Sequence, residues 1–198
     1  QVKAIWSGDV VEIFQYEFPV KVGEDNCRPG RSAEATEERK VLNRLKTMRR
    51  ARSNLMRLIN ANVRRWHDDS GRPYEPVFLT LTFRENIRDI DKGNRAFRNF
   101  IRRFEYDTGL KLKYVCVIEF QRRGAIHYHL VIFNLPFIPV ERIAKIWRHG
   151  FVKVNVIHEV DNVGAYMAKY MGKDVMDERL KGEKSYFSSR GLHKPKEM

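Results

Sequence analysis

The stretch IEFQRRGAIHYHLVIF, from Ile118 to Phe133, contains the features that decide the fold. Gly124 is the turn signal in its middle, and the apolar residues on both sides favour strands, so the stretch predicts a β-hairpin. If the hairpin centres near Arg123, the numbers of facing residues sum to about 246. Glu119 then lies opposite His127. Since successive side chains alternate between faces, Glu119, His127 and His129 share one face of the hairpin.

These three polar residues are hard to explain as ordinary core. Two imidazoles and a carboxylate that converge on one point can coordinate a divalent cation and leave positions open. The alternative is that the histidines only hydrogen-bond Glu119 or the backbone. A shift of the turn by one residue would move Glu119 to the other face and remove the site. His149 and His158 are competing candidate ligands.

The rest of the chain predicts strands mixed with helices. Because the hairpin requires antiparallel pairing, the expected fold class is α+β, with a central antiparallel β-sheet flanked by helices. Apolar periodicity and turn residues predict the following elements: strands within 1–24, a loop over 24–38, a basic helix over 39–66, a strand over 76–83, a helix over 90–106, a helix over 140–150 that ends at Gly150, a strand over 151–160, a helix from Asp161 or Asn162 to about Glu178, and a polar, basic tail.

The charge of the chain favours a polyanionic partner. Lys and Arg number 38 against 25 Asp and Glu, which gives a net charge of +13. Such an excess is commonly matched to nucleic acid, although a merely basic soluble protein is the plainer interpretation. The candidate DNA-binding residues are Arg49, Arg50 and Arg52 on the basic helix and Arg122 and Arg123 at the hairpin tip. A solvated helix face and ordinary turn residues explain these arginines about as well.

Two further properties bear on location. No apolar run approaches the roughly 20 residues that span a membrane, so no membrane partner is expected. The two cysteines, Cys27 and Cys116, cannot form a disulfide framework, and Cys116 lies in an apolar strand, where a buried free thiol is expected. A cytoplasmic location, in a bacterial host cell, is therefore expected.

The segment VGAYMAKYMGK, residues 163–173, contains a second group of residues with possible chemistry. Tyr166 and Tyr170 are one helical turn apart and share a face, with Lys169 next to Tyr170 and Lys173 beyond it. Tyrosine pairs at this spacing are usually packing residues. The lysines and the candidate metal site favour a catalytic interpretation here.

Together these residues resemble the HUH endonucleases, and more narrowly the replication-initiator domains of rolling-circle plasmids and single-stranded DNA phages. His127-Tyr128-His129 resembles the metal-binding motif of that family, and Glu119 matches the position of its acidic ligand. FLTLTF at 78–83 resembles its first motif, and AYMAKYMGK resembles its two-tyrosine motif. WRHGFVKV at 147–154 and SSRGLHKP at 188–195 are also similar to segments of such initiators, so the resemblance covers residues 76–195.

The resemblance implies a fold, an activity and partners. The fold is the initiator nuclease fold with a ferredoxin-like core. The activity is nicking and joining of single-stranded DNA at a replication origin through a 5′-phosphotyrosine, with Tyr166, Tyr170 and Lys169 as catalytic residues and Lys173 as a DNA contact. The lysines would lower the phenol pKa by stabilising the phenolate. The metal would be Mg²⁺ or Mn²⁺, although the ligands alone would also suit Zn²⁺. The implied partners are single-stranded or hairpin origin DNA and a host or linked helicase.

The expected organisation is a single domain over 1–198, with N-terminal strands and the basic helix in 1–75 and the catalytic core in 76–195. Two alternatives stay open. The first is a relaxase or single-tyrosine transposase of the same superfamily, although the His triad and N-terminal tyrosine usual in relaxases are not visible. The second is a non-catalytic nucleic-acid-binding module.

Overall fold

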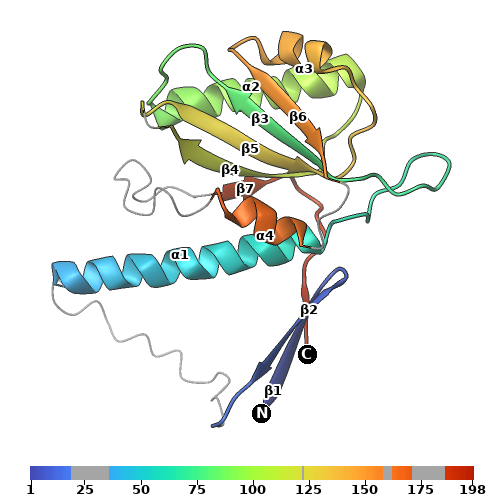
Figure 1. Cartoon of the computed structure of the whole chain (residues 1–198). Coiled ribbons are helices and arrows are strands. Elements are labelled where there is room, and N and C mark those ends of the chain that lie inside the picture. The colour runs from blue at the N-terminus through green and yellow to red at the C-terminus, as the bar shows by residue number, and fades with distance from the viewer. Residues whose placement is uncertain (19–35, 122, 158–161, 171–185) are drawn as a thin grey trace.

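The computed structural model describes residues 1–18, 36–121, 123–157, 162–170 and 186–198. Cys27, Arg122, His158 and Lys173 lie outside these residues. The helices and strands, in chain order, are β1 Val2–Ser7, β2 Val10–Gln15, α1 Glu37–Asn60, β3 Val77–Thr82, α2 Ile90–Thr108, β4 Tyr114–Phe120, β5 Ile126–Ile132, α3 Val140–Trp147, β6 Val152–Val156, α4 Val163–Ala168, β7 Tyr186–Ser188 and β8 Lys196–Glu197 (Figure 1).

The central sheet has five antiparallel strands in the order β6-β3-β5-β4-β7. The predicted hairpin is β4–β5, and its predicted register is confirmed, because Glu119 pairs with His127 and Val117 with His129. Alternation of side chains along these strands therefore places Glu119, His127 and His129 on one face. The expected α+β class, with a central antiparallel sheet flanked by helices, is confirmed.

Each face of the sheet has its own hydrophobic cluster. On one face, α2 and α3 pack over the apolar side chains of the central strands, including Cys116, Tyr128 and Leu130 (Figure 1). On the other face, α4 and the C-terminal half of α1 pack over a smaller cluster that includes Phe78, Val117 and Val131. The three polar hairpin residues lie on this second face, so they are enclosed between the sheet and the two helices.

The chain ends come together in a second sheet of three strands, in the order β2-β1-β8. Ala4 and Met198 exchange backbone hydrogen bonds of 3.0 Å. Arg57 of α1 donates from Nε to Glu12 of β2 at 2.5 Å, which connects this sheet to the helix. The polar tail predicted from the sequence thus contains two strands, because β7 also completes the edge of the central sheet beside β4.

Two helix ends differ from the prediction. The basic helix α1 ends at Asn60 rather than Trp66, and its C-cap is Ala61. Helix α3 ends at Trp147, before the expected Gly150, because Arg148 adopts the left-handed conformation with φ 67° and donates its N–H to Ala144. Gly150 is needed for a different reason. A Cβ there would collide with the backbone of Thr82 and lie 2.5 Å from Arg84 N, so α3 could not pack so closely against the end of β3.

A glycine also allows α4 to pack directly against α1. A Cβ on Gly164 would collide with Met56 O, 2.8 Å from Met56 Cα and 2.9 Å from Asn60 Oδ1. We expect Gly164→Ala to lower the free energy of unfolding by about 1–3 kcal/mol, because overpacking forces the two helices apart. Urea denaturation measures this effect. Ala165→Ser on the same helix, at a half-buried position, is the control, and an unchanged midpoint for Gly164→Ala would contradict the packing.

No helix in the described part of the chain combines the length and apolar character that crossing a membrane requires.

Candidate metal and tyrosine site

Glu119, His127 and His129 form a compact group on the face of the sheet that α4 covers. Glu119 comes from β4 and the two histidines from β5, and their candidate ligand atoms all lie within 4.8 Å of one another. The short turn between the two strands and the alternation of side chains are what bring them together. The three predicted ligands therefore meet in the structure as the sequence pattern requires.

His129 is the best-fixed member of the group. Its side chain is 6% exposed and that of Glu119 is 13% exposed, and His129 Nε2 lies 2.6 Å from Glu119 Oε2. The other ring nitrogen, Nδ1, lies 3.2 Å from the hydroxyl of Thr80 on β3. If Nδ1–H donates to Thr80, the lone pair of Nε2 points at Glu119 and is available to a cation that both side chains share.

His127 supplies the atom that fits a metal best. Its Nε2 is buried and has no hydrogen-bond partner among the residues that the structure describes. Burial, together with the neighbouring His129, lowers the pKa of His127 to about 4, so its imidazole is neutral at pH 7. A buried neutral nitrogen without a partner is costly unless something binds it. One carboxylate and two imidazoles form a donor set that fits a divalent cation.

Thr80 provides a test of how His129 is oriented. Groups that hydrogen-bond a metal-ligating histidine typically change metal affinity by 10–100-fold when they are removed. We expect Thr80→Val, which keeps the side-chain shape, to weaken Mn²⁺ binding by about tenfold or more in calorimetric titration. Thr82→Val is the matched control, since Thr82 lies on the same strand and makes no side-chain hydrogen bond with the described residues. Equal affinities of the two variants would argue against this role of Thr80.

Helix α4 is held over this group by two asparagines. Asn162 is its N-cap and accepts from Ala165 N at 2.8 Å. The buried Asn60 at the end of α1 donates to Asn162 Oδ1 at 2.9 Å and accepts from Gly164 N at 2.8 Å. These bonds satisfy the first turn of a very short helix and fix the tyrosines that follow. The expected N-cap at Asp161 or Asn162 is thus Asn162, and within the described residues the helix ends at Ala168.

The two tyrosines reach the metal-binding group through aromatic contacts. The Tyr170 ring stacks on His129, with centroids 4.2 Å apart and planes at 28°. Tyr170 also stacks on Phe78, which Tyr166 meets edge-on at 5.6 Å. The rings of Tyr166 and Tyr170 lie 6.3 Å apart. The structure therefore brings Tyr170, on a segment distant in sequence, into direct contact with one of the three candidate ligands.

The electrostatic environment of Tyr170 differs from the expectation. The resemblance implies lysines that lower the phenol pKa, but burial and a side-chain hydrogen bond with Tyr166 raise the pKa of Tyr170 to about 12. Lys169 is exposed, and its Nζ lies over the Tyr166 ring, 5.4 Å from the centroid. The phenol of Tyr170 is thus protonated at neutral pH, and its activation requires a positive charge closer than those of the described residues.

The predicted DNA contacts are distributed differently. Arg49, Arg50 and Arg52 are exposed on α1, before the turn at 56–60 that packs against α4. Arg123 is engaged within the fold, because its guanidinium donates to Gln121 Oε1 at 2.9 Å and to Phe83 O at 3.0 Å. It therefore fastens the hairpin tip to the end of β3.

Sequence reasoning missed one residue of the site and misplaced none of the described ligands. Thr80 was not singled out, although alternation along TLTF would have placed it on the face of the candidate ligands. His149, a competing candidate ligand, is exposed at the end of α3 and contacts Phe83 and Trp147 instead, on the opposite face.

The fold and the site together define an α+β protein with a group of side chains able to hold a metal ion beside paired tyrosines. The family model of the ORF2-type replication-associated proteins matches residues 76–175, just over half of the chain. The chain belongs to this family, which implies a role in initiating replication and DNA as the partner. No curated protein and no solved structure matches the chain significantly.

Proposed function

We propose that this protein is a metal-dependent endonuclease and strand transferase that nicks single-stranded origin DNA through a 5′-phosphotyrosine. The observation that carries the proposal is the stacking of Tyr170 on His129, because it puts a candidate nucleophile against a candidate ligand. Membership of a replication-associated family and the excess of basic residues support DNA as the substrate. Glu119, His127 and His129 would hold the metal, with Mg²⁺ or Mn²⁺ as the proposed ion.

The proposed reaction exchanges one phosphodiester for another. A tyrosine oxygen forms a bond to the scissile phosphorus while the bond to the 3′ oxygen breaks, and the phenol proton is balanced by the new 3′-OH. A divalent cation bound at the three ligands would polarise the phosphate and stabilise the developing charge. The raised pKa of Tyr170 fits this arrangement, because the free phenol stays protonated until DNA and cation are bound. The stored bond energy lets the 3′-OH of a strand reverse the step.

The second tyrosine gives the proposed site a further capacity. Tyr166 on α4 and Tyr170 just after it both contact Phe78, so both hydroxyls are assigned to one site. While one tyrosine holds a DNA end, the other could attack a second phosphodiester without release of the first. Lys169, beside the Tyr166 ring, is proposed to favour the phenolate of Tyr166. Arg49, Arg50 and Arg52 are proposed to contact the DNA backbone along α1.

A covalent adduct tests the proposal. The protein is incubated with end-labelled single-stranded origin-type oligonucleotide and Mn²⁺, and the products are separated on a denaturing gel. The expected result is a labelled protein–DNA band that depends on the metal and is absent with EDTA. Binding of the oligonucleotide without any adduct, unaffected by EDTA, would contradict the proposal and favour a non-catalytic nucleic-acid-binding module.

A further inference from the structure

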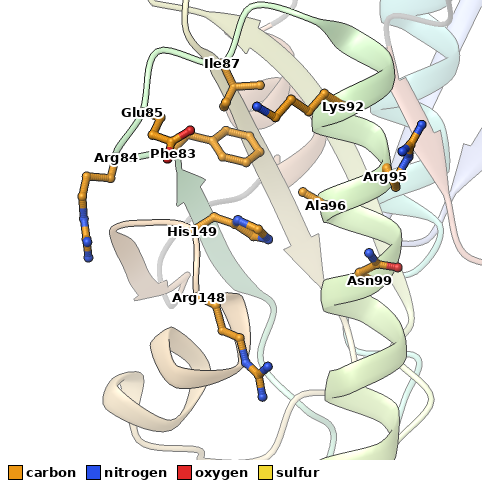
Figure 2. Close-up of a pocket in the computed structure, with 10 residues that line it drawn as sticks. All are labelled: Phe83, Arg84, Glu85, Ile87, Lys92, Arg95, Ala96, Asn99, Arg148 and His149. Atoms are coloured by element: carbon orange, nitrogen blue, oxygen red, sulfur yellow. The ribbon is translucent and has the colours of Figure 1, made fainter.

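A basic pocket lies on the other face of the sheet, at the end of β3. It encloses about 370 Å³ between the β3–α2 connection, the first turns of α2 and the residues after α3 (Figure 2). Arg84, Lys92, Arg95 and Arg148 contribute cationic side chains, and Glu85 is the only acid among the described residues that line it. A volume of this size falls within the usual range of ligand sites.

The four cations have no protein counter-ion. Within the part of the chain that the structure describes, none of Arg84, Lys92, Arg95 and Arg148 forms an ion pair or a side-chain hydrogen bond, and all four are exposed. They come from three separate segments, so folding brings like charges together. The field of Arg148 is felt nearby, because burial and then the Arg148 charge lower the pKa of Arg103. Gathering uncompensated positive charge costs stability and is typical of an anion-binding site.

The floor of the pocket is aromatic and firmly held. Phe83 is 3% exposed, and the exposed ring of His149 lies 5.8 Å from it. Trp147 lies beneath His149 at 5.0 Å and donates from Nε1 to Thr82 O at 3.0 Å. Arg84 N donates to His149 O at 2.8 Å, which ties the two sides of the floor together. An aromatic surface beside arginines suits a flat, charged ligand such as a nucleotide.

The pocket is also close to the metal and tyrosine site along the chain. Thr82 pairs with His127 in the sheet, and Phe83 is the next residue. Because neighbouring side chains of a strand point to opposite faces, the pocket and the site lie on opposite faces of the same strand end. A DNA strand that passes over the end of β3 would reach from one to the other, across roughly the 10 Å of a packed layer.

We propose that this pocket binds one unpaired nucleotide of the DNA strand that also occupies the metal and tyrosine site, with its phosphate on the arginines and its base on His149. The inference rests on the proposed function for the identity of the strand. A base that is paired and stacked within a duplex could not enter an enclosed pocket, so the ligand is single-stranded. The pocket would anchor the strand at a fixed distance from the scissile phosphate.

The test measures binding apart from cleavage. Fluorescence anisotropy with labelled single-stranded oligonucleotides in EDTA is applied to Arg95→Gln with Arg148→Gln, and separately to His149→Ala. The double variant is expected to bind at least about tenfold more weakly, with the salt slope reduced by about 0.7 for each lost phosphate contact. His149→Ala is expected to lose about tenfold or more, through lost stacking. Arg98→Gln, an exposed charge on α2 that does not line the pocket, should retain wild-type affinity.

The outcomes separate this inference from the proposed function. If the wild type forms the covalent adduct but the pocket variants bind DNA as Arg98→Gln does, the pocket inference is wrong and the proposed function stands. If no protein forms an adduct but the pocket variants lose affinity and salt dependence, the pocket is supported and the nuclease is not. Equal competition by free deoxynucleoside monophosphate and by oligonucleotide would also overturn the inference, because the pocket would then serve a free nucleotide.

Discussion

Replacing both Tyr166 and Tyr170 by phenylalanine is expected to eliminate the covalent protein–DNA adduct. With no phenol oxygen at the site, the nucleophile is lost, and the rate should fall by at least about four orders of magnitude. The substitution removes only the hydroxyls, so the rings keep their contacts with Phe78 and His129. Denaturing gels with labelled single-stranded DNA and Mn²⁺ measure the adduct, and DNA affinity should stay near that of the wild type.

A neighbouring tyrosine is the matched control for this pair. Tyr186 on β7 is half-buried and packs in the same hydrophobic cluster, and its residue pairs with Val117 in the sheet. Tyr186→Phe should therefore leave adduct formation intact. The single variants Tyr166→Phe and Tyr170→Phe then show which phenol attacks first. Adduct formation by the double variant at the wild-type rate would remove both tyrosines from the mechanism.

Loss of a metal ligand should have the second largest effect. We expect Glu119→Ala and His127→Ala each to lower the rate of cleavage by about a thousandfold at a fixed Mn²⁺ concentration, because metal ions contribute several kcal/mol to transition states of this charge. Calorimetric titration should show the same variants losing Mn²⁺ affinity. EDTA treatment of the wild type should reproduce the effect, and added Mn²⁺ should restore activity.

His67→Ala is a control for the removal of a histidine as such, since His67 lies outside the group of candidate ligands. It should change neither Mn²⁺ affinity nor cleavage. If Glu119→Ala and His127→Ala bound Mn²⁺ as tightly as the wild type, the three side chains would form only a hydrogen-bonded cluster, as in the plainer interpretation of the hairpin.

The part of the fold that local patterns determine could be predicted from the sequence. The register of β4–β5 follows from one turn residue and from strict alternation of apolar side chains, so the meeting of Glu119, His127 and His129 was predictable. The N-cap at Asn162 and the helix α2 follow equally local signals. The register also corresponds to two separate hydrophobic clusters, because each face of the hairpin packs against different helices.

The remaining features depend on contacts between distant segments. Strands β7 and β8 are short and polar, and they form only because β4 and β1 offer edges to pair with. The end of α3 at Arg148 depends on its packing against β3. The raised pKa of Tyr170 comes from burial against the sheet, and the basic pocket combines residues from three segments. None of these has a local signal in the sequence.

The most direct test of the account locates the phosphotyrosine itself. Trypsin cleaves after Lys153, Lys169 and Lys173, which places Tyr166 and Tyr170 in different peptides. After reaction with single-stranded DNA and Mn²⁺ and digestion of the DNA, mass spectrometry of these peptides should find a nucleotide on Tyr166, Tyr170 or both. Unmodified tyrosines in both peptides, from a reaction in which the DNA has been cleaved, would contradict the account.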